Sequence, residues 1–65
     1  MKSSFPARDA LAPGMNVVIV EKHNQATGAE SVGTIDRILT HDATHPHGIK
    51  VMLTDGRVGR VKRIS

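Results

Sequence analysis

Two stretches in the first half of the chain have the hydrophobic pattern of short β-strands. Residues 15–22 are compact and β-branched, which predicts a largely buried strand. Residues 32–40 carry apolar side chains at positions whose spacing also fits a short helix. Gly33, Thr34 and the β-branched content favour a strand there instead. The interval 23–30 between these segments is polar and predicts a loop.

The second half contains the clearest alternation. Residues 49–54 alternate apolar and polar positions, which places Ile49, Val51 and Leu53 on one face of a strand. The pair Asp55-Gly56 then predicts a two-residue type I′ turn. Residues 57–62 therefore return as a fourth strand, paired with the third as a hairpin.

The fourth strand repeats with a period of three, because Gly56-Arg57-Val58 is followed by Gly59-Arg60-Val61. A regular strand would send the two valines to opposite faces. We expect a bulge at Gly59, which would turn both valines inward and Arg57, Arg60 and Lys62 outward. The alternative is a plain strand with Val61 half exposed.

The remaining segments are irregular. Residues 1–13 lack a sustained period and are punctuated by prolines, so they predict an N-terminal arm with at most one helical turn at 8–12. Residues 41–48 predict a polar loop, in which His45-Pro46 sets an extended turn and Gly48 allows a positive φ. We therefore expect an all-β fold: a small SH3-like barrel of four to five antiparallel strands, spanning residues 14–65.

The composition limits the cellular compartments that fit this chain. Sixty-five residues without cysteine provide no disulfide, no thiolate nucleophile and no zinc-finger ligand set, which fits a reducing compartment such as the cytoplasm. The start of the chain lacks the apolar stretch of a signal peptide, and the longest apolar run is too short to span a bilayer. We expect a cytoplasmic location and no membrane partner.

Positive charge concentrates in the second half. Residues 1–30 carry three basic and three acidic side chains, whereas residues 31–65 carry six basic and three acidic. A segment with Arg57, Arg60, Lys62 and Arg63 but no acid attracts polyanions. Charges on an edge strand also prevent aggregation, and that interpretation has equal weight.

The assembled motifs resemble those of the YwbE-like family of small uncharacterised bacterial proteins. The matching positions lie from Gly14 almost to the C-terminus, and the most distinctive are His-Pro-x-Gly-Ile-Lys-Val and Asp-Gly-x-Val-Gly-Arg-Val. They comprise Gly14-Met15, Val17 to Val20, Lys22, Gln25, Thr27-Gly28, Gly33, Ile38 to Thr40, His45-Pro46, Gly48 to Val51, Leu53, Asp55-Gly56 and Val58 to Val61. The resemblance implies no activity, because the family has none established.

The chain departs from the family pattern in its first loop. Asn24 replaces a usual aspartate, and Ala26 and Ala29 stand where basic residues are common, so we expect this loop to be a weaker polyanion contact. A looser likeness to KOW-type and other SH3-like modules of ribosome-associated proteins rests on the spacing of glycines and strands.

Catalytic and metal chemistry are poorly supported by the residues. His41, His45 and His47 with Asp42 could offer metal ligands, but structural zinc needs four well-fixed ligands, and a polar loop explains them better. Ser31, His45 and Asp42 lack the context of a nucleophile elbow. We expect a protein that is not an enzyme, with no catalytic residue, metal, cofactor or small-molecule substrate.

The aromatic content excludes several classes of binding site, because Phe5 is the only aromatic residue. Aromatic cages, proline-ligand grooves and base-stacking platforms all need more. What remains is recognition of phosphates and shape in structured RNA or duplex nucleic acid. The candidate contacts are Lys50, Arg57, Arg60, Lys62 and Arg63, with Arg37, Lys22, His45 and His47 at the margin. About five neutralised phosphates would give a log–log salt slope of about −4 to −5.

An alternative function is a protein-interaction or self-associating structural module, such as a homodimer that pairs through a strand edge. The strand at 15–22 is apolar on both faces, with Val17 and Ile19 on one and Val18 and Val20 on the other. In this alternative its second face would be buried against a partner protein.

Overall fold

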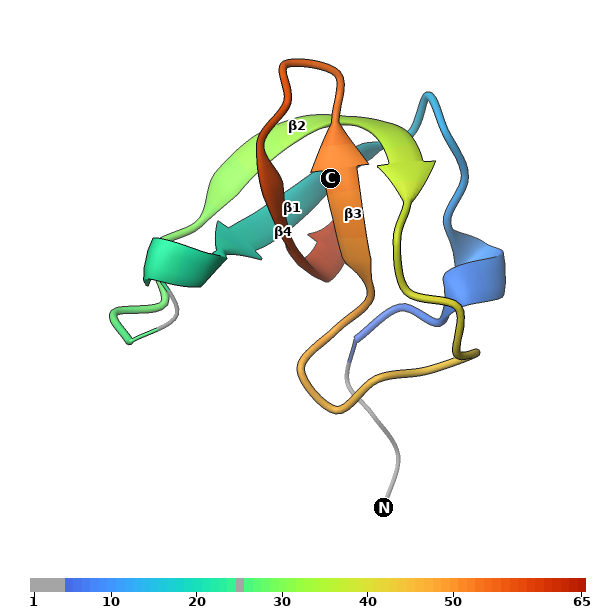
Figure 1. The fold of residues 1–65 in the computed structure, drawn as a ribbon, viewed down its shortest axis with the longest axis horizontal. Helices are drawn as coiled ribbons and strands as arrows, with labels where there is room; N and C mark the ends of the chain where they lie inside the picture. Colours follow the sequence, from blue (N-terminus) through green and yellow to red (C-terminus); the bar gives the residue numbers. More distant parts are fainter. Residues whose placement is uncertain (1–4, 25) are drawn as a thin grey trace.

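The protein is a small closed barrel of antiparallel strands, seen in a computed structural model that describes residues 5–24 and 26–65. Within these residues four strands pair in the order β1-β2-β3-β4, and β4 returns to pair with β1 (Figure 1). The strands are β1 (Asn16–Glu21), β2 (Ser31–Ile38), β3 (Lys50–Leu53) and β4 (Val58–Ile64). The expected all-β class is confirmed, and the closed barrel is consistent with the SH3-like type.

The core fills the barrel with aliphatic side chains. All three residues assigned to the inner face of the third strand, Ile49, Val51 and Leu53, are buried. The full cluster comprises Leu11, Val17, Ile19, Ile35, Ile49, Val51, Leu53 and Val61. Burying a side chain of this size contributes about 1.5–3 kcal/mol, so a domain this short depends on most of them.

Strand β2 pairs with two different strands along its length. Its first half pairs with β1 through Ser31 to Thr34, and its second half pairs with β3 from Ile35 to Ile38. The Cα partners change from β1 at Thr34 to β3 at Ile35, and the β2–β3 pairing has a register irregularity between Ile35 and Arg37. The strand predicted for this segment is confirmed over the alternative helix.

The N-terminal arm packs against the barrel. Its predicted helical turn is the short 3₁₀ helix η1 (Arg8–Ala10), and Leu11 beyond it joins the core. The backbone N–H of Arg8 donates to the carbonyl of Ala43 at 2.8 Å, which ties the arm to the loop before β3. The first four residues of this predicted arm, and Gln25 of the predicted 23–30 loop, lie outside the described residues.

The hairpin between β3 and β4 is present, but its turn differs from the expected type I′. Such a turn needs positive φ at both central residues, whereas Gly56 has φ 91° and Asp55 does not have positive φ. The N–H of Gly56 donates to Leu53 O at 2.9 Å, and the N–H of Leu53 donates to Arg57 O at 2.7 Å. The connection is therefore a three-residue loop, a type I turn followed by a glycine bulge.

The bulge predicted at Gly59 is wrong. Pairing of β4 is regular through Gly59, and the extra residue is Lys62, between Val61 opposite Ile19 and Arg63 opposite Val18. Gly59 is required for space, because a Cβ there would lie 2.7 Å from Val20 O and 2.9 Å from Ile19 Cδ1.

The inward positions of β4 differ accordingly. Val61 is fully buried, so the alternative that left it half exposed is also wrong. Val58 is only half-buried and lies outside the core cluster, because the regular alternation turns it to the other face. Arg60 occupies that outer face with it, as expected.

Candidate nucleic-acid interface

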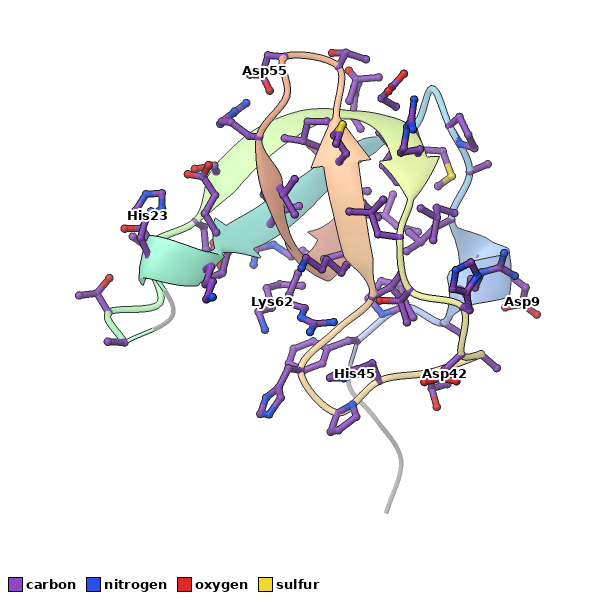
Figure 2. All side chains as sticks on the ribbon, viewed as in Figure 1. Asp9, His23, Asp42, His45, Asp55 and Lys62 are labelled. Atoms are coloured by element: carbon purple, nitrogen blue, oxygen red, sulfur yellow. The ribbon has the colours of Figure 1, made fainter. Side chains whose placement is uncertain are left out.

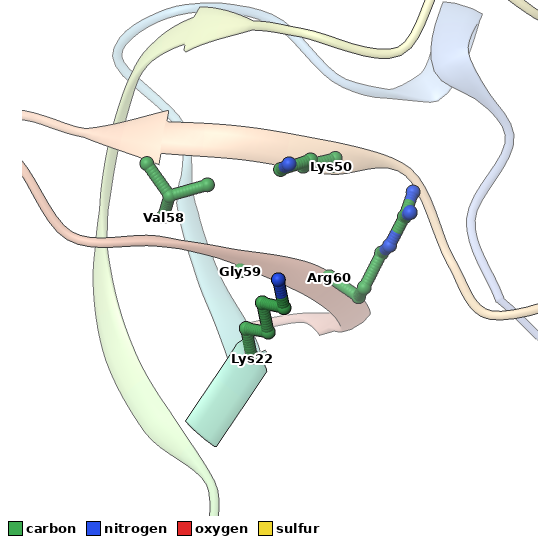
Figure 3. Close-up of a pocket in the computed structure, with 5 residues that line it drawn as sticks. All are labelled: Lys22, Lys50, Val58, Gly59 and Arg60. Atoms are coloured by element: carbon green, nitrogen blue, oxygen red, sulfur yellow. The ribbon is translucent and has the colours of Figure 1, made fainter. Parts of the chain in front are cut away.

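Three cations from three elements line one pocket on the outside of the barrel. Lys22 begins the 3₁₀ helix η2 (Lys22–Asn24), Lys50 begins β3, and Arg60 lies on β4. With Val58 and Gly59 they line a cavity of about 380 Å³ (Figure 3). Lys50 and Arg60 are direct partners in the β3–β4 ladder, so their side chains leave the same face of the hairpin. The fold thus gathers cations that lie far apart in sequence.

Neutral oxygens hold two of these residues in place. Thr40 Oγ1 accepts from the backbone N–H of Lys50 at 2.8 Å and from Arg60 Nη1 at 3.4 Å. Arg60 Nη1 also donates to the carbonyl of Gly48 at 3.3 Å. These contacts orient the guanidinium without cancelling its charge. Within residues 5–24 and 26–65, Lys22, Lys50 and Arg60 take part in no ion pair.

A second pocket of about 380 Å³ is lined by Val20, Gly28, His47 and Lys62. Lys62 Nζ donates to the carbonyl of His47 at 2.7 Å and lies 4.3 Å from the centroid of the Phe5 ring. Burial, and secondarily the charge of Arg60, lowers the pKa of the Lys62 ammonium. Lys62 therefore adds positive charge beside Arg60. Its ammonium already contacts the carbonyl of His47 and the ring of Phe5.

The loop at 45–48 supports this region. Gly48 has φ 98°, as expected, and its N–H donates to His45 O at 3.0 Å. The N–H of His47 donates to His45 Nδ1 at 3.1 Å, and the two imidazole centroids are 5.8 Å apart. The consecutive carbonyls of His47 and Gly48 accept from Lys62 and Arg60, so the loop positions both cations.

Metal ligation finds no geometric support in this loop. Across the described part of the chain, no three His, Cys, Asp or Glu side chains come together as a metal site would need.

Arg57 is an internal contact rather than an open cation. Its Nε donates to Asp55 Oδ2 at 2.7 Å, and its Nη2 donates to the carbonyl of Val32 at 3.1 Å. The backbone N–H of Arg57 and then its side chain hold the pKa of the Asp55 carboxyl below its ordinary value. Asp55 lies at the hairpin tip, at the opposite end of the hairpin from His45 and Lys62 (Figure 2).

Arg63 is paired in the same way. Its two terminal nitrogens donate to both carboxylate oxygens of Glu30, at 2.7 and 2.8 Å. This bidentate bond lowers the pKa of Glu30 and raises the pKa of Arg63. Arg37, on β2, lies 3.6 Å from Asp36 and lines neither of these two pockets. Two of the four cations at 57–63 are thus neutralised by acids outside this segment, Arg57 by Asp55 and Arg63 by Glu30.

The structure therefore sorts the nine predicted contacts into three groups. Lys22, Lys50 and Arg60 share one pocket; Lys62 and His47 share the second; and Arg37, Arg57, Arg63 and His45 line neither. Sequence reasoning missed Thr40, whose hydroxyl joins Lys50 and Arg60, and the contact of Phe5 with Lys62. Thr40 carries no sequence signal beyond its place at the end of a predicted strand.

The surface suggested for a protein partner is covered by the chain itself. Val18 and Val20, on the second face of β1, are 5% and 4% exposed. The four described strands also close on one another, which removes the continuous open edge that strand pairing would use. The large apolar side chains that remain exposed in the described residues are Val32 and Ile64.

Comparisons with known proteins agree on one family. The model of the family described as "Uncharacterized conserved protein (DUF2196)" matches residues 4–64. "Uncharacterized protein YwbE" of Bacillus subtilis (strain 168) is 49% identical over 57 residues, which cover 88% of each chain. No solved structure matches significantly, so the looser likeness to KOW-type modules is not confirmed. No helix among the described residues is long and apolar enough to cross a membrane.

Proposed function

This chain belongs to the DUF2196 family, as the YwbE-like motifs indicated; the family's description names no activity, and we propose from the geometry of the surface that the chain binds structured RNA through phosphate contacts. The observation that carries the proposal is the pocket at the base of the β3–β4 hairpin. Three cations line it, and none of them is engaged in an ion pair within the described residues. Such a site attracts phosphate oxygens, which accept strong charge-assisted hydrogen bonds.

Repulsion between Lys50 and Arg60 favours an anionic ligand in this pocket. Lys50 and Arg60 face each other directly across two strands, and like charges in such a pair destabilise a sheet. An anion between them would reverse that repulsion. By contrast, Arg57 and Arg63 already have carboxylate partners and would have to give them up to bind phosphate.

The choice of structured RNA over unpaired strands rests on the scarcity of aromatic rings. Recognition of unpaired bases depends on stacking against aromatic side chains. Phe5 is the only aromatic residue of the chain, and its ring lies against the Lys62 ammonium. Phosphate and shape recognition need no such platform, so a folded RNA or a duplex suits this surface. We propose a cytoplasmic, non-catalytic binding role.

The test is binding of a structured RNA, followed by fluorescence anisotropy at physiological salt. The double variant Lys50→Gln/Arg60→Gln removes two pocket cations and should weaken binding by about tenfold or more. A matched control, Arg8→Gln/Arg37→Gln, removes two exposed charges outside the pocket and should have a much smaller effect. Equal losses in the two double variants would mean generic attraction to a basic protein, and the proposal would fail.

Salt dependence gives a second readout of the same proposal. If the pocket cations Lys22, Lys50 and Arg60 neutralise between one and three phosphate charges, log K should fall against log salt with a slope between about −1 and −3. This range is shallower than the sequence suggested, because Arg57 and Arg63 are paired with carboxylates and Lys62 already donates to His47 O. A slope near zero would exclude phosphate contacts.

The protein-interaction or self-associating alternative keeps one supporting feature, the exposed side chains of Val32 and Ile64. Hydrodynamic size at moderate protein concentration separates the two functions. A concentration-dependent dimer that binds no RNA would favour the alternative. A monomer that binds RNA through the pocket would favour the proposal.

A further inference from the structure

We infer that the pocket lined by Lys22, Lys50 and Arg60 receives a terminal phosphate monoester of a nucleic-acid strand, rather than only internal phosphodiesters. This inference rests on the proposed function and names the chemical group that the same site selects.

The charge of the site carries the inference. Three cations from η2, β3 and β4 line one cavity, and no carboxylate of residues 5–24 or 26–65 lines it with them. An internal phosphodiester carries a single negative charge, whereas a phosphate monoester carries about −1.5 to −2 at pH 7 and has three free oxygens. Three donors around one cavity therefore match a monoester better in both charge and number of acceptors.

The shape of the site agrees with this choice. Lys22 extends from η2 toward the strands that carry Lys50 and Arg60, so the cations border the cavity from more than one side (Figure 3). A monoester can present three free oxygens to cations on different sides, whereas an internal phosphodiester has two and carries the strand away in both directions. The half-buried side chain of Val58 adds an apolar wall beside which the terminal sugar can lie.

The neighbouring residues suggest how the strand would continue. Arg60 and Lys62 donate to the consecutive carbonyls of Gly48 and His47, so the two cations lie near each other, and Lys62 lines the second pocket with His47. The next phosphates of a strand anchored at the first pocket would meet these side chains. A terminal phosphate at the first pocket and diester contacts at the second are thus compatible.

The experiment compares one RNA hairpin in three forms, with a 5′-phosphate, with a 3′-phosphate, or with hydroxyls at both ends. Anisotropy is measured for the wild-type protein and for Lys22→Gln at constant salt. One phosphorylated form should bind about fivefold more tightly than the hydroxyl form, the effect of one added charge near a cation. Lys22→Gln should reduce this ratio toward one while the hydroxyl form still binds.

A change of pH provides an independent check on the ligand. The second ionisation of a phosphate monoester has a pKa of about 6, so at pH 5 the group carries nearly one charge. The ratio between phosphorylated and hydroxyl RNA should then fall but stay above one, because the monoester keeps one charge that the hydroxyl end lacks. Any effect of pH on the protein that is common to both complexes cancels in this ratio.

The outcomes separate the inference from the proposed function. Equal affinity for all three hairpins, with Lys50→Gln/Arg60→Gln still weakened, would overturn the terminal-phosphate inference alone. No binding of any hairpin would overturn the proposed function. A nucleoside monophosphate that binds as tightly as phosphorylated RNA would support recognition of the monoester but count against a polymeric ligand.

Discussion

Lys50 and Arg60 are direct partners across the β3–β4 ladder, so two positive charges occupy one cross-strand pair. A pair of opposite charges at the same position would stabilise the hairpin. The barrel therefore carries a local electrostatic cost at the pocket lined by Lys22, Lys50 and Arg60, which take part in no ion pair within the described residues. The anionic ligand that we propose would offset this cost.

The first prediction separates folding from binding at this pair. Lys50→Glu should raise the free energy of unfolding by about 0.2–1 kcal/mol, because repulsion becomes attraction across the strands. The same change should weaken RNA binding, since a carboxylate now borders the phosphate pocket. Urea denaturation and anisotropy on the same sample measure both effects. A variant that loses stability and binding together would point to a purely structural role for Lys50.

The second prediction concerns Arg57. Arg57→Gln should lower the urea midpoint, because it removes the bond to Asp55 and the hydrogen bond to Val32 O, the latter contributing about 0.5–1.5 kcal/mol. RNA affinity should change much less than in Arg60→Gln. This expectation differs from the one based on charge alone, in which the two arginines were equivalent. Equal binding losses in Arg57→Gln and Arg60→Gln would return Arg57 to the binding surface.

The third prediction is a dependence of stability on pH through Glu30. Its bond from Arg63 lowers the pKa below the ordinary 4.5, so the ion pair stabilises the fold above that pH. As the pH falls through the folded-state pKa, the unfolded state binds protons first and this contribution disappears. Wild-type protein should exceed Glu30→Gln in urea midpoint at pH 7, and the two should converge once the pH falls below the folded-state pKa of Glu30. A constant difference across this range would contradict the assignment.

The fourth prediction tests Thr40 as a positioning residue. Thr40→Val keeps the side-chain shape but removes the hydroxyl that accepts from Lys50 N and Arg60 Nη1. RNA affinity should fall although every cation remains, and Thr40→Ser should restore it. Because both substitutions leave the net charge unchanged, the salt slope should stay near its wild-type value. A valine variant with full affinity would remove Thr40 from the site.

Much of the fold could be predicted from the sequence because alternation along a strand is a local property. The burial of Ile49, Val51 and Leu53 follows directly from that pattern. The position of the β4 bulge does not, because it depends on how Val61 and Arg63 align with residues of β1 more than forty positions away. Gly59 suggested a bulge, yet its role is close packing against Val20 O.

The candidate site was predictable only in part. A run of cations in sequence does not reveal which of them the fold pairs with acids, and Glu30 meets Arg63 across 33 positions. Lys22 and Lys50 lie in different segments, and only closure of the barrel brings them to one pocket. The local sequence is enough to predict a positively charged surface. It is not enough to predict which cations remain without an ion pair, because that depends on contacts between distant residues.

The pairing of β1 with β4 also bears on how the chain folds. Val17 meets Ile64, 47 positions later, so the barrel closes through contacts that are remote in sequence. Bringing such distant segments together loses chain entropy before their pairing gains any free energy. The three-residue turn, by contrast, lets the β3–β4 hairpin form locally. We expect refolding in milliseconds to seconds, with the hairpin assembled first and the docking of β1 limiting the rate. Substitutions in β1 such as Ile19→Val should then slow refolding. Changes at the hairpin turn should change the refolding rate by a different amount, and stopped-flow kinetics can measure both rates.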